Sequence, residues 1–178
     1  MTSEGHWHSA VVYQVYWRSF KDGNGDGIGD LKGLRSKIGY LSSLGVDAIW
    51  LNPTYPSPQG DHGYDVSNYF DVDPLFGTLE ELEQAIDEFH DHGMAVLLDI
   101  VPNHVSSQHP WFISAKEGGH GHEAESRFII RQGKGDSGGI PPNDWKSVFG
   151  GPAWSKFPTE AGRPQRWYLH MFLSLIHI

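Results

Sequence analysis

One loop near the start of the sequence carries oxygen-bearing groups at alternate positions, a spacing that suits a hard cation. The expected ligands are the side chains of Asp22, Asn24, Asp26 and Asp30 and the backbone carbonyl of Ile28. Ca²⁺ takes six to eight oxygen ligands, and alternate residues of a tight loop can all point inward toward one ion. The spacing therefore predicts a calcium site. Three carboxylates would repel one another without a cation, which indicates a structural role for the metal.

Two alternatives to this calcium site follow from the same residues. An EF-hand would carry a bidentate Glu at the twelfth position of the loop, where this chain has Gly33. The loop therefore has EF-hand-like ligand spacing on a different scaffold. The other alternative is a Gly- and Asp-rich turn that binds no metal, in which Asp30 caps a helix beginning at Leu31. Four oxygen-bearing side chains at the right spacing favour the metal.

A second set of polar side chains could bind a sugar. Asp61 and Tyr64 lie in a long loop, and Asp99 and His104 follow an apolar run further along the chain. Carboxylates and imidazoles hydrogen-bond to sugar hydroxyls, and a Tyr ring offers its face to the apolar side of a pyranose. Each residue taken singly has a structural alternative, such as satisfying backbone donors at a strand end. Only their combination points to a sugar site.

The elements that must position these residues alternate between strand and helix. Short runs rich in apolar, β-branched and aromatic residues predict strands, and apolar positions at helical spacing predict helices. The strands are expected at residues 10–17, 46–51 and 94–101, and the helices at residues 31–44 and 79–89. Thr78 and Glu81 form a capping box at the start of the second helix.

This order of elements requires crossover connections and therefore a parallel sheet with both faces covered. A doubly wound sheet and a (β/α)₈ barrel both fit it. The long connection over residues 52–77 follows a strand, and no Gly-x-Gly-x-x-Gly turn follows the first strand, so the barrel is favoured. Beyond His104 the sequence is rich in Gly, Pro and Trp, which predicts an irregular subdomain.

Composition limits the partners. The formal net charge of -9 and the pI near 5.6 argue against a nucleic-acid partner. The sequence has no cysteine, and it shows neither a secretory signal at its start nor an apolar run long enough to cross a membrane. We therefore expect a cytoplasmic protein without a membrane partner.

Four segments taken together resemble the α-amylase family of glycoside hydrolases, and within it the α-glucosidases and oligo-1,6-glucosidases. These segments are residues 13–20, 22–30, 63–67 and 99–104. The similarity runs from about Val11 to Phe172. The resemblance implies a glycosidase that acts on an oligosaccharide substrate.

The resemblance also implies a fold and roles for individual residues. Residues 1–104 would form the amino-terminal part of a (β/α)₈ TIM barrel, with about three βα units, and residues 105–172 an inserted, incomplete B subdomain, while residues 173–178 would be an off-pattern tail. Asp61 would bind hydroxyls of the terminal glucose, and Tyr64 would stack beneath it. His104, beside Asp99, would bond the 6-hydroxyl, and Phe149 would line the same subsite.

Family members hydrolyse with retention, using a carboxylate nucleophile and a carboxylic acid/base about 5 Å apart. The resemblance places these catalytic residues on later strands, so we expect this chain alone to be inactive and poorly soluble. The alternatives for the complete protein are a transglycosylating sucrose or maltose isomerase of the same fold and a non-catalytic relative of transporter heavy chains. A plain calcium-binding module is a further alternative, against which the Asp61 and His104 groups argue.

Overall fold

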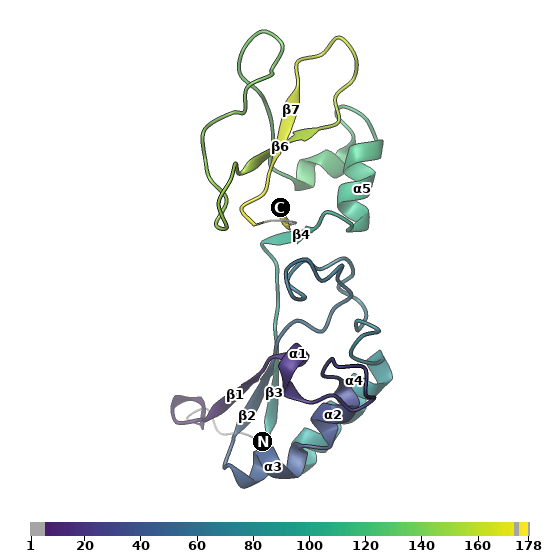
Figure 1. Ribbon diagram of the computed structural model, residues 1–178, viewed down its shortest axis with the longest axis vertical. Coiled ribbons are helices and arrows are strands. Elements are labelled where there is room, and N and C mark those ends of the chain that lie inside the picture. The colour runs from purple at the N-terminus through teal and green to yellow at the C-terminus, as the bar shows by residue number, and fades with distance from the viewer. Residues whose placement is uncertain (1–5, 173–174, 178) are drawn as a thin grey trace. The chain divides into compact units, whose positions relative to one another are not determined.

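Figure 1 shows the computed structural model, which describes residues 6–172 and 175–177. The chain forms two compact units. The first comprises Met1–Pro56 and Phe70–Ile100, and the second comprises Ser57–Tyr69 and Val101–Ile178. The division predicted from the sequence at residue 104 stays a prediction. Each of the two observed units instead combines two separate segments of the chain.

The first unit is built on a parallel three-stranded sheet, as predicted. Its strands, in spatial order, are β1 (Val12–Val15), β2 (Ala48–Leu51) and β3 (Ala95–Leu98). Tyr13 pairs with Ile49, and Ile49 pairs with Val96, so the three strands are in register. The first strand is shorter than expected because Trp17 already begins a short helix, α1 (Trp17–Phe20).

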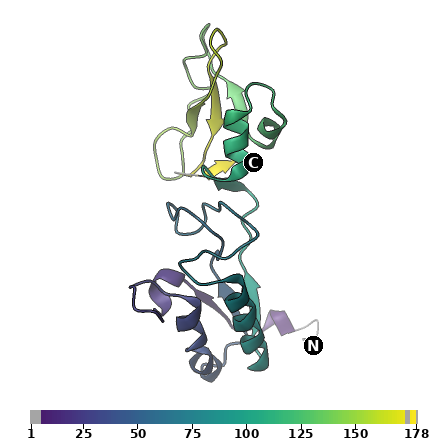
Figure 2. The ribbon, with the colours of Figure 1, turned by 90° about the vertical axis from the view of Figure 1, so that its right-hand side faces the viewer.

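Helices cover one face of this sheet, as Figures 1 and 2 show. They are α2 (Leu31–Arg35), α3 (Ile38–Ser43) and α4 (Leu79–Asp91). Alternate residues of the strands point to this layer, and Ile49 packs in one core with Leu34 and Phe89. On the opposite face the side chains of Trp50 and Leu97 are each 37% exposed.

The prediction of one continuous helix at residues 31–44 is wrong, because the chain forms two helices there. The break falls at Ser36 and Lys37, between α2 and α3. The Ser36 hydroxyl donates to the Gly33 carbonyl at 2.6 Å, and such local side-chain bonds compete with regular helix bonding. The predicted capping box is confirmed, since Thr78 and Glu81 exchange both hydrogen bonds.

The second unit is less regular, as predicted, although it contains more structure than the sequence indicated. An antiparallel sheet has the order β5 (Ile130–Gln132), β7 (Arg166–Leu169) and β6 (Trp154–Phe157), and β4 (His104–Ser106) pairs with β8 (Leu175–His177). A helix, α5 (Pro110–Glu117), and a 3-10 turn, η2 (Glu123–Arg127), pack beside them. Of the expected tail, residues 173, 174 and 178 lie outside the described part of the chain.

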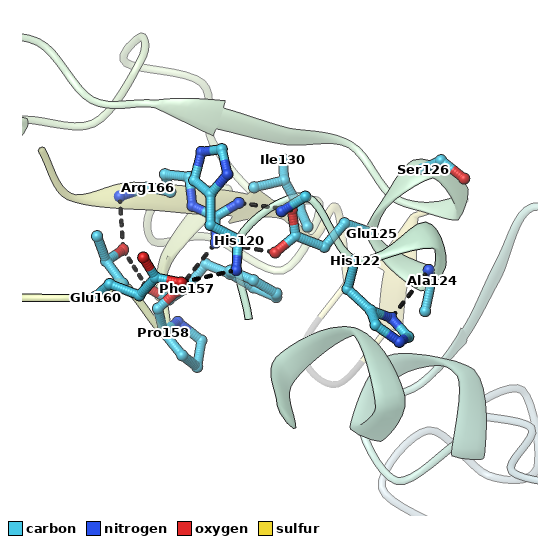
Figure 3. Close-up of polar contacts among 12 residues, drawn as sticks. His120, His122, Ala124, Glu125, Ser126, Ile130, Phe157, Pro158, Glu160 and Arg166 are labelled. Carbon is cyan, nitrogen blue, oxygen red and sulfur yellow. Dashed lines mark hydrogen bonds and ion pairs between the residues drawn. The ribbon is translucent and has the colours of Figure 1, made fainter. Parts of the chain in front are cut away.

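Aromatic rings and one ion pair hold this unit together. Phe112 packs edge-to-face against Phe128 and Phe157 in a buried cluster. Beside it the Arg166 guanidinium bonds both carboxylate oxygens of Glu125, at 2.6 and 2.9 Å, and lies over the Phe157 ring (Figure 3). The Arg166 and Glu125 side chains are only 11% and 12% exposed. The pair therefore joins η2 to β7 at a site largely shielded from water.

Candidate functional site: a sugar-binding loop and an acidic loop

The loop over residues 57–65 belongs to the second unit and carries two of the predicted sugar-binding residues, Asp61 and Tyr64. A single carboxylate, that of Asp65, organises it. Asp65 is fully buried and accepts hydrogen bonds from the Ser57 hydroxyl at 2.6 Å, from the Gly60 N–H at 2.9 Å and from the Asp61 N–H at 3.1 Å. The Tyr64 N–H donates in turn to the Asp61 carbonyl at 3.0 Å. The loop thus has a defined backbone although it lacks regular structure.

His104, at the start of β4, contacts this loop directly. Its Nε2 lies 3.1 Å from the Tyr64 carbonyl oxygen and, because a carbonyl only accepts, must carry the proton. Burial lowers the pKa of His104, against the opposing effects of the Tyr64 carbonyl and of the nearby Asp61 and Asp65 carboxylates. The lowered pKa favours the neutral form of the ring. Its Nδ1 is buried and has no hydrogen-bond partner in the described part of the chain.

Phe149 reaches the same neighbourhood through a second aromatic residue. The Phe149 ring, itself exposed, packs edge-to-face on Phe172 with centroids 5.8 Å apart, and the Phe172 ring lies 5.6 Å from that of His104. Sequence reasoning did not select Phe172. The available signal was its place at the end of the resembling stretch, three residues after the end of β7, where a side chain can reach a neighbouring loop.

The structure thus gathers four of the five predicted sugar-binding residues in one unit: Asp61, Tyr64, His104 and Phe149. Asp99 belongs to the first unit, where its carbonyl accepts a hydrogen bond from the Tyr55 hydroxyl at 3.2 Å. The association of Asp99 with the other four stays a prediction. Carboxylate, imidazole and aromatic groups are the kinds of polar and apolar groups that contact hexose rings, and the sugar-binding role of these residues stays a prediction.

The acidic loop at residues 22–30 lies in the first unit between α1 and α2, and its oxygens turn inward. Asp22 Oδ1 accepts from the Gly25 N–H at 2.6 Å, and Asp22 Oδ2 accepts from the Gly27 N–H at 2.8 Å. These backbone hydrogen bonds lower the pKa of Asp22. Asn24 and Asp26 make similar bonds to residues two positions further on. The side-chain oxygens therefore face the loop's own backbone.

Asp30 has a second role at the end of the acidic loop. Its Oδ1 accepts from the Gly33 N–H at 2.6 Å and caps α2, while its Oδ2 accepts from the Gly23 N–H at 3.2 Å. The capping part of the alternative interpretation is therefore correct. Within the described residues no group of three His, Cys, Asp or Glu side chains is arranged to hold a metal. The donor types still suit calcium, because each carboxylate oxygen has a second lone pair and the Asn24 amide and the Ile28 carbonyl add neutral oxygens.

Comparisons with known proteins identify the family. A sequence profile described as the catalytic domain of α-amylase matches residues 14–176. The chain therefore belongs to the α-amylase family, whose (β/α)₈ barrel enzymes share its fold. It is 47% identical over 168 residues to a probable α-glucosidase of Rhizobium meliloti, covering 94% of this chain and 29% of that protein. It is 45% identical to the probable oligo-1,6-glucosidase 3 of Bacillus subtilis, covering 93% of this chain and 28% of that protein.

Solved structures agree. A trehalulose synthase, MutB, superposes with a TM-score of 0.85 at 45% identity, and a trehalose-6-phosphate hydrolase of Bacillus licheniformis with a TM-score of 0.87 at 40% identity. Each match covers 96% of this chain and 30% of the other. The chain thus spans just under a third of the length of its relatives, and it corresponds to a part of their (β/α)₈ barrel fold. None of the helices described here combines the length and the apolar character needed to cross a bilayer.

Proposed function

We propose that the complete protein containing this chain is a retaining α-glucosidase that releases glucose from the ends of short α-linked oligosaccharides. One observation carries the proposal: the loop that bears Asp61 and Tyr64 is bonded to His104, so three groups that recognise a sugar occur together. The similarity to named α-glucosidases and oligo-1,6-glucosidases supports the same reaction.

In this proposal the residues of the chain bind and orient the terminal glucose. The Asp61 carboxylate accepts hydrogen bonds from sugar hydroxyls, which are strong because the acceptor is charged. Tyr64 packs its ring on the apolar face of the sugar, and His104, whose Nε2 already bonds the Tyr64 carbonyl, accepts from the 6-hydroxyl at Nδ1. Asp99 is proposed as a further sugar-binding residue. The carboxylate nucleophile and the acid/base belong to later strands of the family's barrel.

The test uses the complete protein and measures hydrolysis of maltose, isomaltose and p-nitrophenyl α-glucoside. Asp61→Asn should lower kcat/KM by about 100-fold, because a lost hydrogen bond to a charged group amounts to as much as ~3 kcal/mol. Asp91→Asn, at the exposed end of α4, is the matched control and should change kcat/KM little. A wild-type protein without turnover, or an Asp61→Asn variant with full activity, would contradict the proposal. Turnover by the 178-residue chain alone would refute the expectation that it is inactive.

A second candidate is a transglycosylating isomerase, which the match to a trehalulose synthase over 96% of this chain favours. The two reactions share a covalent intermediate and differ in whether water or a sugar hydroxyl attacks it. Incubation with sucrose separates them. Glucose and fructose as the main products indicate hydrolysis, and an isomeric disaccharide indicates transglycosylation.

The proposal includes a structural Ca²⁺ in the acidic loop, bound by Asp22, Asn24, Asp26, the Ile28 carbonyl and Asp30. Bound there, the cation would offset two of the three carboxylate charges and stabilise the turn between α1 and α2. The lowered pKa of Asp22 supports this, since it keeps that ligand ionised over a wide pH range.

We also propose a cytoplasmic location, which a cysteine-free sequence fits and which fractionation of the source cells would test.

A further inference from the structure

The backbone on either side of Asp61 adopts conformations that ordinary residues avoid. Gln59 has φ of 59° and His62 has φ of 53°, and these are the two non-glycine residues with positive φ in the described part of the chain. Such residues persist only where their surroundings hold them, and they cluster at ligand-binding sites. Both lie within two positions of the residue proposed to bind the terminal glucose. Something must therefore hold this loop in place.

The group that holds it is the Asp65 carboxylate. Its two oxygens accept from the Ser57 hydroxyl and from the successive N–H groups of Gly60 and Asp61, which closes the loop on its own start. The Asp61 carbonyl is bonded as well, by the Tyr64 N–H. Both backbone groups of Asp61 are thus engaged, its N–H by Asp65, and these bonds set the backbone from which its side chain projects.

We propose that Asp65 is a positioning residue for sugar recognition: it does not touch the substrate, and it acts by fixing the backbone of Asp61. The inference rests on the proposed function, because it requires Asp61 to bind the sugar. Preorganisation of this kind matters because a misplacement of about 1 Å in a binding group can lower the rate about 100-fold. The position requires a carboxylate of this length. An amide would turn an NH₂ group toward a donor, and Glu would add a methylene at a site that is 0% exposed.

The first experiment is Asp65→Asn in the complete protein, assayed on maltose. KM should rise about tenfold with kcat changed less than about threefold, which is the pattern of lost substrate binding. Ser57→Ala, which removes one of the donors to Asp65, should also raise KM, but by less. A variant that was merely unstable would lose active enzyme, and therefore maximal rate, without a change in KM.

Asp73→Asn is the matched control. Asp73 is also a buried carboxylate in the connection after β2, its Oδ1 accepts from the Leu75 N–H at 3.0 Å, and it belongs to the first unit. This variant should lower the melting temperature and leave KM unchanged. A comparable rise in KM in Asp73→Asn would show that loss of any buried carboxylate in this connection has the same effect, and it would overturn the inference.

A double-mutant cycle gives the decisive result. If Asp65 acts through Asp61, Asp65→Asn should have no further effect on KM once Asp61→Ala has removed the binding group. Additive effects of the two substitutions, or an Asp65→Asn variant that folds and keeps the wild-type KM, would overturn the inference while the proposed function stands. A wild-type protein without glucosidase activity would instead overturn the proposed function itself.

Discussion

The two units of this chain place their polar groups differently. In the first unit the acidic loop at residues 22–30 is largely exposed, and the Arg35 and Glu88 side chains of the ion pair between α2 and α4 are 31% and 39% exposed. Its buried carboxylates, Asp30 and Asp73, accept hydrogen bonds from backbone N–H groups. In the second unit Asp65 and His104 are buried, and the Arg166–Glu125 pair is nearly so.

The difference follows from the regularity of the backbone. Strands and helices satisfy their own N–H and C=O groups, so the core of the first unit can be apolar, with residues such as Leu34, Ile49 and Phe89. Irregular segments must find other partners for the same groups. Buried Asp30 and Asp73 supply them in the connections of the first unit, and Asp65 supplies them in the second. We therefore expect loss of the shielded Arg166–Glu125 pair in the second unit to cost more stability than loss of the exposed Arg35–Glu88 pair in the first.

The largest expected effect is at Arg166. Arg166→Met should destabilise the second unit by about 3 kcal/mol, because it leaves the Glu125 carboxylate buried without its guanidinium partner. Hydrogen exchange at amides of β7 would measure this loss.

The double variant Arg166→Met with Glu125→Leu serves as the control for this prediction. It removes both charges and should recover much of the stability, since a buried ion pair is often replaceable by apolar residues of similar size. If the single variant lost less than about 1 kcal/mol of stability, this pair would contribute no more than a surface ion pair does. The predicted difference between the two units would then be wrong.

Calcium should stabilise the first unit by slightly less than the loss expected at Arg166. At a free concentration 100 times its Kd, a ligand that binds only the folded state contributes about 2.7 kcal/mol. Addition of EGTA should therefore speed hydrogen exchange in α2 and β1 and leave β7 unchanged. Asp22→Ala is the matched variant and should not respond to EGTA. Equal stability of the wild-type protein with and without calcium would refute the metal site.

Acid should weaken the second unit through Glu125. Burial acts to raise the pKa of Glu125, but hydrogen bonds from Arg166 and from the Gly121 N–H outweigh it and hold the pKa below its usual value. Its contribution to stability is therefore complete above the unfolded pKa of about 4.3 and is lost as the pH falls through the lower folded value. Glu125→Gln should flatten this dependence in a pH series of β7 exchange rates. An unchanged slope would assign the acid sensitivity to other carboxylates.

The smallest expected effect is at Arg35. The hydrogen bond from Arg35 lowers the pKa of Glu88, yet both groups are partly solvated and water screens the pair. Arg35→Met should destabilise the first unit by no more than about 1 kcal/mol. Urea denaturation of the Arg35→Met and Arg166→Met variants would compare the two losses of stability. An equal loss in the two variants would contradict the prediction that the exposed pair contributes less.

The regular part of the fold was predictable because its signals are local. The parallel strands followed from three apolar runs, and the start of α4 followed from the spacing of Thr78 and Glu81. The break at Ser36 was not predictable, since the apolar period continues through it and the local bond from the Ser36 hydroxyl to the Gly33 carbonyl leaves no such pattern. Helix α5 was missed because its eight residues are too few to establish a pattern.

The candidate site was predictable in its residue types and only partly in its geometry. The resemblance selected Asp61, Tyr64 and His104 as sugar-binding residues, and that role stays a prediction. It did not reveal that Asp65 holds the loop, because that depends on three donors converging on one buried carboxylate. Phe172 was missed for a similar reason, since its contact with His104 joins residues 68 positions apart.

The exposed face of the β1–β2–β3 sheet has a consequence for protein synthesis. Val12, Trp50 and Leu97 are 43%, 37% and 37% exposed there, and β1 and β3 are the outer strands of the sheet. A nascent chain that has been synthesised through β3 therefore presents an exposed apolar surface, which favours aggregation, and two unpaired strand edges. Chaperones that capture extended apolar segments should bind it at this stage, and their depletion should lower the yield of soluble protein.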